Sequence, residues 1–366
     1  MWLMSMLREI PREICAMDIC CKGAHVGEMA SEAEELGAKV FHCPLDVTHV
    51  AFACRLTRVL RAGNYDIVHN HLNAYSGFPV WIAHRAGIPA LTTFHSTRFD
   101  PEDPRLQIPG VRGLRRLYEF ISTRYAVRKS DMVTGVSKTV LDKFVHQGNQ
   151  FSGMSDVLYL GVNLPEASTE EERPAFRKSL GWAEDTPIVL HVGSFKETKN
   201  HSGVLAVFER VLGALPHARL LLAGEGHLRT KIENDTKRQQ IDHAVRFLGL
   251  RDDVLRLMTL CDVLLFPSLQ EGFPLVALEA GGAGLPVVAS KIPAMSEAIQ
   301  DGVTGILHAL DDLPGMADSV VRLLLDQSLR GQLGQAGQER VQQEFSTSAA
   351  AHRLLSLYGR LISKSK

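Results

Sequence analysis

Short runs rich in β-branched and aliphatic residues alternate with longer amphipathic runs along most of the chain, and this rhythm constrains the fold most strongly. In the first half, the short runs predict strands at 13–21, 39–45, 65–72, 89–96 and 131–137. The amphipathic runs predict helices at 28–36, 53–63 and 77–87, with Gly37, Gly63 and Gly87 placed for left-handed helix ends. Strands that alternate with helices favour βαβ units and a parallel sheet.

The rhythm is interrupted at 164–187, a polar, acidic and proline-containing stretch that we interpret as a linker. It then resumes, with strands predicted at 188–193, 218–224, 244–249, 262–268 and 286–290. We therefore expect an α/β protein with two Rossmann-like, doubly wound domains that face a cleft. The expected divisions are 1–165, 166–345 and a final segment, 346–366. Ligands of such sheets bind outside the carboxyl ends of the strands.

Composition narrows the class of protein. The 366 residues are 45% hydrophobic and carry a formal net charge of -1, which favours a globular protein and disfavours a nucleic-acid-binding surface. The six cysteines form no CxxC pair, so we expect a reduced, cytoplasmic protein rather than a disulfide scaffold. No apolar run approaches the roughly 20 residues of a membrane span.

The stretch LFPSLQEGFPLVALEAGGAGLPVVAS, residues 265–290, places Glu271 and Glu279 in strongly apolar surroundings. A predicted strand ends at Pro267, and a predicted helix follows with Pro274 near its first turn. Free N–H groups at the N-terminus of this helix can bind oxyanions. Glu271 and Glu279 are eight positions apart, slightly more than two helical turns, so both carboxylates can reach one face. The other interpretation is a helix-capping Glu271 and a solvated Glu279.

This stretch resembles the E-x7-E signature of retaining glycosyltransferases of family 4, the group 1 transferases with the GT-B fold. The similarity is strongest over 186–310 and extends to YDIVHNHL, TTFHS and GVS in the first half. It implies a hexosyltransferase that moves a sugar from a nucleotide-diphosphate sugar, of UDP or GDP type, to an acceptor hydroxyl with retention. The second half would bind this donor and the first half a sugar or lipid-linked acceptor, in cell-surface polysaccharide or glycolipid synthesis.

The resemblance also assigns roles to single residues. Glu271 and His95 would contact the donor sugar, and Lys199 would neutralise the diphosphate without a catalytic metal or other cofactor. Glu279 would bind the ribose. The other positions expected at the donor are Gly193, Ser194, Gly224, Gly249 and the backbone of Gly272, Phe273 and Pro274. The family often has Arg where this chain has Ser194. Taken alone, Lys199 is also consistent with a surface lysine, and His95 with a capped strand end.

Two further features have two interpretations each. His69 and His71 share a strand face and, with His95, could ligate a metal, but no carboxylate accompanies them and we expect no metal site. Residues 110–130 contain six basic side chains against one acid. They form either a solvated helix face or a peripheral contact with anionic lipid or a lipid-diphosphate acceptor at the inner face of the cytoplasmic membrane.

The ends of the sequence carry two more expectations. Family members open with a strand and a glycine-rich loop before the helix that here begins at Trp2, so we expect an unfilled position between the strands at 13–21 and 65–72. The 366-residue form would then be poorly stable, and weakly active or inactive as a transferase. The final helix, 347–364, is expected to pack on the first domain. A nucleotide-sugar epimerase or hydrolase, or a non-catalytic nucleotide-sugar-binding chain, stays open as another function.

Overall fold

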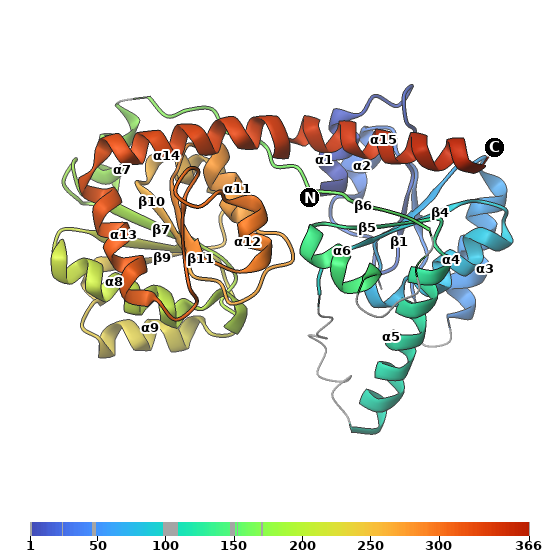
Figure 1. Ribbon diagram of the computed structural model, residues 1–366, viewed down its shortest axis with the longest axis horizontal. Helices are drawn as coiled ribbons and strands as arrows, with labels where there is room; N and C mark the ends of the chain where they lie inside the picture. The colour runs from blue at the N-terminus through green and yellow to red at the C-terminus, as the bar shows by residue number, and fades with distance from the viewer. Residues whose placement is uncertain are drawn as a thin grey trace. The chain divides into compact units, whose positions relative to one another are not determined.

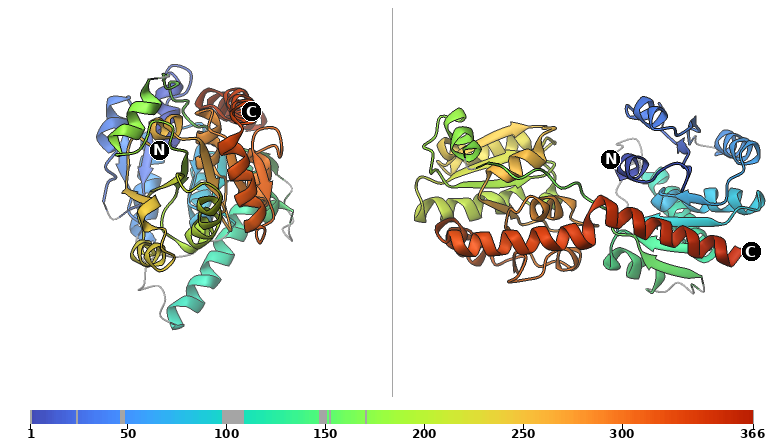
Figure 2. Two further views of the ribbon diagram at one scale, coloured as in Figure 1. Left: turned by 90° about the vertical axis from the view of Figure 1, so that its left-hand side faces the viewer. Right: turned by 90° about the horizontal axis from the view of Figure 1, so that it is seen from above.

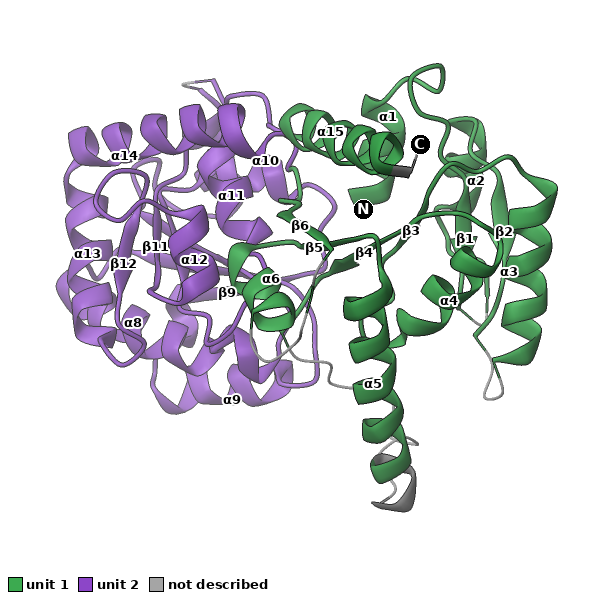
Figure 3. Cartoon of the chain, turned by 45° about the vertical axis from the view of Figure 1, so that its right-hand side comes forward, with its two compact units in different colours: residues 1–161, 347–366 green, residues 162–346 purple. Residues whose placement is uncertain are grey.

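A computed structural model describes residues 2–23, 25–45, 49–97, 109–146, 151, 153–169 and 171–365. The chain forms two compact units (Figure 3), which are residues 1–161 with 347–366 and residues 162–346. Each unit combines parallel β-sheet with packed helices (Figures 1 and 2). The α/β class with parallel sheets is therefore confirmed.

Unit 2 contains one parallel sheet of six strands in the order β12-β11-β10-β7-β8-β9. The strands are β7 (Ile188–Val192), β8 (Arg219–Ala223), β9 (Val245–Gly249), β10 (Val263–Phe266), β11 (Val287–Ser290) and β12 (Ile306–His308). Numbered from β7, this is the doubly wound order 3-2-1-4-5-6 read from β9. The order in which successive strands are added therefore reverses between β7 and β10, the two central strands.

Alternate residues of these strands face opposite helix layers, because successive side chains of a strand point to opposite faces. The side chains of Val189, Leu265 and Val288 pack in one core cluster with Phe208 and Val320. These two residues belong to the adjacent helices α8 (His201–Ala214) and α13 (Leu313–Leu325). The helices of unit 2 are α7 (Glu172–Ser179), α8 (His201–Ala214), α9 (Arg229–Arg238), α10 (Val254–Leu260), α11 (Leu275–Gly282), α12 (Pro293–Ala298), α13 (Leu313–Leu325) and α14 (Gln327–Arg340). α7 occupies the middle of the stretch interpreted from sequence as linker.

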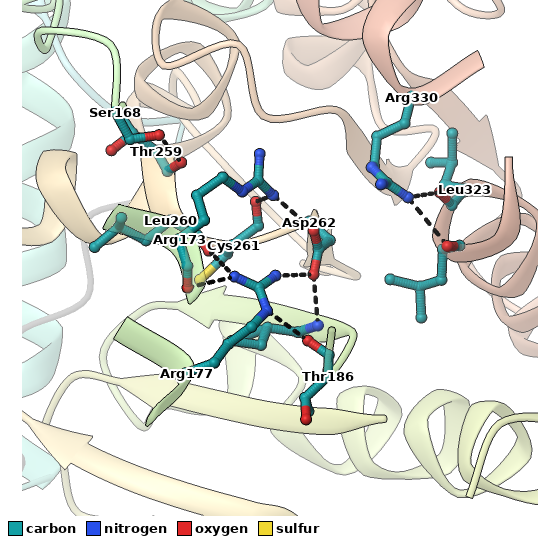
Figure 4. A network of polar contacts seen from close by, with 12 residues as sticks. Ser168, Arg173, Arg177, Thr186, Thr259, Leu260, Cys261, Asp262, Leu323 and Arg330 are labelled. Atoms are coloured by element: carbon teal, nitrogen blue, oxygen red, sulfur yellow. Dashed lines mark hydrogen bonds and ion pairs between the residues drawn. The ribbon is translucent and has the colours of Figure 1, made fainter. Parts of the chain in front are cut away.

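A buried ionic network fixes α7 to the end of the sheet where the strands begin (Figure 4). Asp262, just before β10, accepts hydrogen bonds from Arg177 at 2.7 Å and Arg173 at 2.6 Å, and from the backbone of Ile188 at 2.8 Å. Arg177 and Asp262 are only 5% and 6% exposed. The network lies at the opposite end of β7 and β10 from the loops that follow them.

Unit 1 contains two separate parallel sheets, β1-β2 and β3-β4-β5-β6. The strands are β1 (Ile19–Cys21), β2 (Val40–His42), β3 (Val68–Asn70), β4 (Ala90–Phe94), β5 (Met132–Gly135) and β6 (Met154–Val157). In the described part of the chain, no ladder joins β1 to β3. The interruption lies where the sequence predicts an unfilled position.

Helices on both faces of these strands make the core of unit 1. They are α1 (Trp2–Glu9), α2 (Ala30–Glu35), α3 (Val50–Ala62), α4 (Gly77–Arg85), α5 (Pro109–Lys129), α6 (Lys138–Val145) and α15 (Thr347–Ser365). α15 buries Leu354, Leu357 and Leu361 against Met6 of α1 and Leu91 of β4. α3 and α4 pack together through Phe52, Leu56 and Ile82. The N-terminal half of α5 extends away from the rest of unit 1 (Figure 1).

Some local predictions need correction. The strand predicted at 13–21 is only three residues long, because the chain turns at 12–14 after Pro11 and leaves Ile14 65% exposed. Gly37 and Gly87 adopt the left-handed conformation at helix ends, with φ of 88° and 75°, but Gly63 is extended with φ of -108°. Strands β6 and β12 were not predicted, since each is a short segment without clear alternation.

Candidate active site

Three loops of unit 2 meet where β7, β8 and β9 end. Gly193 donates its N–H to the carbonyl of Ala223 at 2.9 Å, and Gly224 donates to the carbonyl of Gly249 at 2.8 Å. A side chain at Gly224 would place its Cβ 2.1 Å from the carbonyl oxygen of Gly193. Glycine is therefore required where these backbones touch, and the loops form one continuous surface at the carboxyl edge of the sheet.

Lys199 and Glu271 form an ion pair across the two central strands. Lys199 lies in the short helical turn η3 (Glu197–Lys199) after β7, and Glu271 lies in the loop after β10. Lys199 Nζ donates to Glu271 Oε1 at 2.7 Å, and the side chains are 19% and 11% exposed. The ammonium also lies 4.9 Å from the ring centre of Phe266. A cation and an acceptor thus occupy the point where the strand order reverses, which is where doubly wound sheets bind ligands.

The loops that carry this pair are tied to each other by backbone and side-chain bonds. Asn200 donates from Nδ2 to the carbonyl of Pro267 at 3.0 Å, and Leu269 donates its N–H to the carbonyl of Thr198 at 2.8 Å. Asn200 has a positive φ of 53° and caps α8 by accepting from the N–H of Gly203. Sequence reasoning missed Asn200, although an Asn directly before a helical run is a recognisable N-cap signal.

The Gly-Phe-Pro turn leads from Glu271 into α11, which begins at Leu275 with Pro274 immediately before it. The ring of Phe273 is buried and lies 5.8 Å from the ring of Phe345. Leu275 donates its N–H to the carbonyl of Phe273 at 3.0 Å. Packing of the Phe273 ring therefore fixes the backbone of the turn beside Glu271.

Glu279 lies within α11 and is mostly buried. Burial raises the pKa of Glu279 to about 7. In the described residues, its carboxylate has no hydrogen-bond or ion-pair partner, and it makes no contact of this kind with Lys199 or Glu271. A carboxylate in such a position gains stability from any hydroxyl donor that a ligand supplies.

Two histidines lie beneath the loop that carries Gly193 and Lys199, and sequence reasoning missed both. His191 lies on β7, and its Nδ1–H donates to the carbonyl oxygen of Leu265 at 2.9 Å. The centre of its ring lies 4.7 Å from that of the His201 ring. Burial lowers the pKa of His191 to about 3 and that of His201 to about 4. Both rings are therefore neutral at physiological pH.

His95 belongs to unit 1, whereas the other predicted site residues belong to unit 2. His95 Nε2 lies 2.9 Å from His71 Nδ1. The backbone N–H of His95 donates to Oδ1 of Asn73 at 2.9 Å. Burial lowers the pKa of His95 to about 4 and that of His69 to about 3, and it holds the pKa of His71 well below its usual value. The three imidazoles are therefore neutral.

His69 is saturated by its neighbours. Its Nδ1 lies 2.8 Å from the hydroxyl of Tyr358 and its Nε2 lies 2.6 Å from Oγ1 of Thr93. Within the described ranges, no group of three His, Cys, Asp or Glu side chains has an arrangement that could hold a metal ion. Both ring nitrogens of His69 serve protein contacts and neither is free to ligate.

Two family models match this chain. The model for group 1 glycosyl transferases matches residues 172–340, and the model for a glycosyl transferase 4-like domain matches residues 3–152. Together they span most of both units. The chain belongs to the group 1 glycosyltransferases of the GT4 type with the GT-B fold, and it is a glycosyltransferase.

Individual relatives agree with this assignment. The chain is 27% identical to the N-acetyl-alpha-D-glucosaminyl L-malate synthase of Bacillus anthracis, over 84% of this chain and 78% of that protein. It is 29% identical to the D-inositol 3-phosphate glycosyltransferase of Mycobacteroides abscessus, over 84% of this chain and 69% of that protein.

Solved structures agree on the fold. Anabaena HepE in complex with UDP superposes with a TM-score of 0.82 and 17% identity, over 98% of this chain and 95% of that one. The sucrose-phosphate synthase of Thermosynechococcus elongatus superposes with a TM-score of 0.72 and 23% identity, over 89% of this chain and 84% of that one.

Proposed function

We propose that this glycosyltransferase takes its sugar from a nucleotide-diphosphate sugar held by unit 2 and passes it to an acceptor hydroxyl with retention. The observation that carries the proposal is the Lys199–Glu271 pair, 2.7 Å apart at the switch between β7 and β10. In this proposal the donor replaces the internal pair, so that its diphosphate takes Lys199 and its sugar hydroxyls take Glu271. Lys199 and Glu271 are then each other's partners in the free protein, and the donor is the partner of both in the complex.

Lys199 acts on the leaving group. As the sugar departs, negative charge grows on the nucleotide diphosphate, and a fixed ammonium stabilises this charge in the transition state. The ammonium of Lys199 already lies within hydrogen-bond distance of Glu271, on the loop that would face the donor. We infer that no divalent metal is needed at this position.

Glu279 and the glycine turns act on the nucleotide. The carboxylate of Glu279, which has no partner among the described residues, is suited to accept hydrogen bonds from the ribose diol, and the loops at Gly224 and Gly249 are the proposed contacts of the nucleotide. Anabaena HepE, which superposes on this chain, has been solved in complex with UDP and with UDP-glucose. We infer a donor of UDP or GDP type for this chain.

Calorimetry with UDP and GDP sugars tests the donor site. Replacing Glu279 by Ala should weaken donor binding about tenfold to a hundredfold, because a hydrogen bond to a charged group contributes about 1.5–3 kcal/mol. Binding and transfer should also be unchanged by EDTA. Unaltered affinity in Glu279→Ala, or activity lost to EDTA and restored by magnesium, would contradict the proposed donor site.

Product analysis separates transfer from its alternatives. Mass spectrometry of reactions with and without candidate acceptors should find sugar transferred only when an acceptor is present, and the anomeric configuration of the donor should be kept. Equal sugar release in water alone would indicate a hydrolase. Donor binding without any product would indicate a binding protein.

The exposed half of α5 supports a proposal about the acceptor. Leu114, Leu117, Phe120 and Ile121 are 74%, 55%, 61% and 55% exposed and lie on one side of the helix. Arg124 and Arg128 continue the same side toward the helix end. An apolar stripe followed by cations matches a lipid surface with anionic headgroups. We propose that this helix contacts membrane and that the acceptor is lipid-linked, as in cell-surface polysaccharide or glycolipid synthesis.

Vesicle sedimentation tests this contact. The wild type should sediment with vesicles that contain phosphatidylglycerol, and Leu117→Asp with Ile121→Asp should abolish sedimentation. Leu325→Asp is the matched control, because Leu325 is also 69% exposed but lies in unit 2. Equal losses in both variants, or no binding by the wild type, would remove α5 as a membrane contact. In the described residues no helix has the length and apolar character of a membrane span.

A further inference from the structure

A cavity of about 690 Å³ opens between α3 and α4 in unit 1. Its volume falls within the range of small-molecule sites, about 300–1,000 Å³. The residues that shape it chemically are Arg58 and Arg61 of α3 and Trp81 and Arg85 of α4. Smaller side chains, including Ala53 and Ala62, leave the space between these four open.

Among the residues that the structure describes, the arginines of this cavity have no acidic partner. Neither α3 nor α4 contains an acidic residue, and no described residue that lines the cavity is acidic. Within the described part of the chain, Arg58, Arg61 and Arg85 form no ion pair. Like charges at positions i and i+3 of a helix repel each other, so Arg58 and Arg61 destabilise α3 slightly. An anion bound between the three guanidinium groups would replace this repulsion by attraction of each arginine to the anion.

Trp81 gives the cavity a second kind of contact. It is 41% exposed, its ring is stacked on that of Phe78 with centres 5.7 Å apart, and Arg85 lies 5.3 Å from its ring centre. Arg61 and Arg85 lie in the last turns of their helices, where cations are favoured in any case. That effect does not account for Arg58 or for an exposed indole in the same cavity.

The position of the cavity separates it from the sugar-transfer chemistry. Arg58, Arg61 and Arg85 lie toward the C-terminal ends of α3 and α4, which lead into the beginnings of β3 and β4. His71 and His95 follow the other ends of the same strands. The cavity therefore lies near the ends at which β3 and β4 begin, whereas the residues expected to contact the reacting sugar lie where these strands end.

We propose that this cavity is a separate binding site for a phosphate ester, whose anion is held by Arg58, Arg61 and Arg85 and whose sugar or other organic part packs on Trp81. Arginine suits this role because its planar fork binds phosphate oxygens in pairs. The ester can be a soluble metabolite or the headgroup of an anionic lipid, since both present the same group. The site does not depend on the proposed donor or acceptor.

Tryptophan fluorescence provides the test, because Trp81 is one of three tryptophans in the chain. The probes are glucose 6-phosphate, inorganic phosphate and vesicles of phosphatidylglycerol in phosphatidylcholine, at 150 mM salt to screen unspecific attraction. The wild type should respond to glucose 6-phosphate or to the vesicles and more weakly to inorganic phosphate, and Trp81→Phe should lose the response. A response to the ester indicates a soluble ligand, and a response to the vesicles alone indicates a headgroup.

Arg58→Glu and Arg55→Glu form a matched pair. Both residues are exposed on α3 and carry the same charge, but Arg55 does not line the cavity. Arg58→Glu should weaken binding of the responding probe at least tenfold, while Arg55→Glu should stay within twofold of the wild type. Circular dichroism and UDP affinity should be unchanged in both. No Trp81-dependent response to any probe, or equal weakening by the two variants, would overturn the proposed site.

Discussion

At the scale of residues, the candidate donor site depends on two carboxylates in different electrostatic states. Glu271 is paired with Lys199, from which it is separated by 72 positions in sequence. Glu279 has no such partner, and burial raises its pKa to about 7. The sequence identifies both acids through their spacing and context. It could not predict their different states, because these depend on the distance to Lys199 and on the depth of burial.

Glu279→Gln should alter the pH dependence of stability. The native state holds the Glu279 proton up to about pH 7, whereas the unfolded chain releases it near pH 4.5. The native state therefore binds more protons within this window, and the wild type loses at most about 3 kcal/mol of stability as pH rises through it. Glu279→Gln should remove this loss and be more stable than the wild type at pH 8.

Urea unfolding of both proteins between pH 4.5 and 8 measures this effect. The quantity of interest is the difference in unfolding free energy between the two proteins, because other titrating groups cancel in it. A difference that stays constant with pH would show that Glu279 titrates normally in the folded protein.

The Lys199–Glu271 pair should be energetically coupled. Lys199→Met leaves the 11% exposed Glu271 side chain without its cation, which should cost about 1–3 kcal/mol of unfolding free energy. Adding Glu271→Gln to this variant should recover part of the loss, since no charge is then left unpaired. Denaturant unfolding of the wild type, both single variants and the double variant gives the coupling energy. Additivity within about 0.5 kcal/mol would show that the pair is not coupled.

At the scale of elements, α7 illustrates how a polar sequence can belong to the core. Its composition predicts linker, yet Arg177 is 5% exposed and bonded to Asp262 at 2.7 Å. Asp262 in turn accepts from the first residue of β7. The network therefore joins α7, β7 and β10 at one end, and the loops at the other end of these strands carry Lys199 and Glu271.

Asp262→Ala should destabilise unit 2 strongly. Removing one partner of a buried ion pair costs about 3–5 kcal/mol, because Arg177 would stay buried without compensation. Asp252→Ala is the control, since Asp252 is an exposed acid of the same unit. Thermal and urea unfolding should show the large loss for Asp262→Ala only. A loss below about 1 kcal/mol would mean that water or another group replaces the carboxylate.

At the scale of the whole molecule, the chain leaves unit 1 at Gly161 and returns to it at Thr347. The last helix then supplies a large share of the core of unit 1. Leu354, Leu357 and Leu361 of α15 are at most 1% exposed and pack near Met6 and Leu91. Unit 1 is therefore built from both ends of the sequence, and unit 2 from its middle.

Leu357→Ala should weaken unit 1 and leave unit 2 intact. A buried Leu replaced by Ala costs about 2–5 kcal/mol through lost burial and the cavity left behind. Ser356→Ala, at an exposed position of the same helix, is the control. Hydrogen exchange followed by mass spectrometry should show faster exchange in β4 and β5 but not in β7 and β8. Equal loss of protection in both units would show that they unfold as one.

The sequence by itself determined most of the elements and the residues of the candidate donor site. Alternating runs predict the strands, glycines mark the close loops, and the context of Glu271 and Glu279 indicates a glycosyltransferase, because these signals are local. Only the tertiary structure decided what depends on residues far apart: the place of α7 in the core of unit 2, the Lys199–Glu271 bond and the arginine-lined cavity between α3 and α4. Local patterns set which conformation a segment adopts, whereas distances and burial arise only when segments pack.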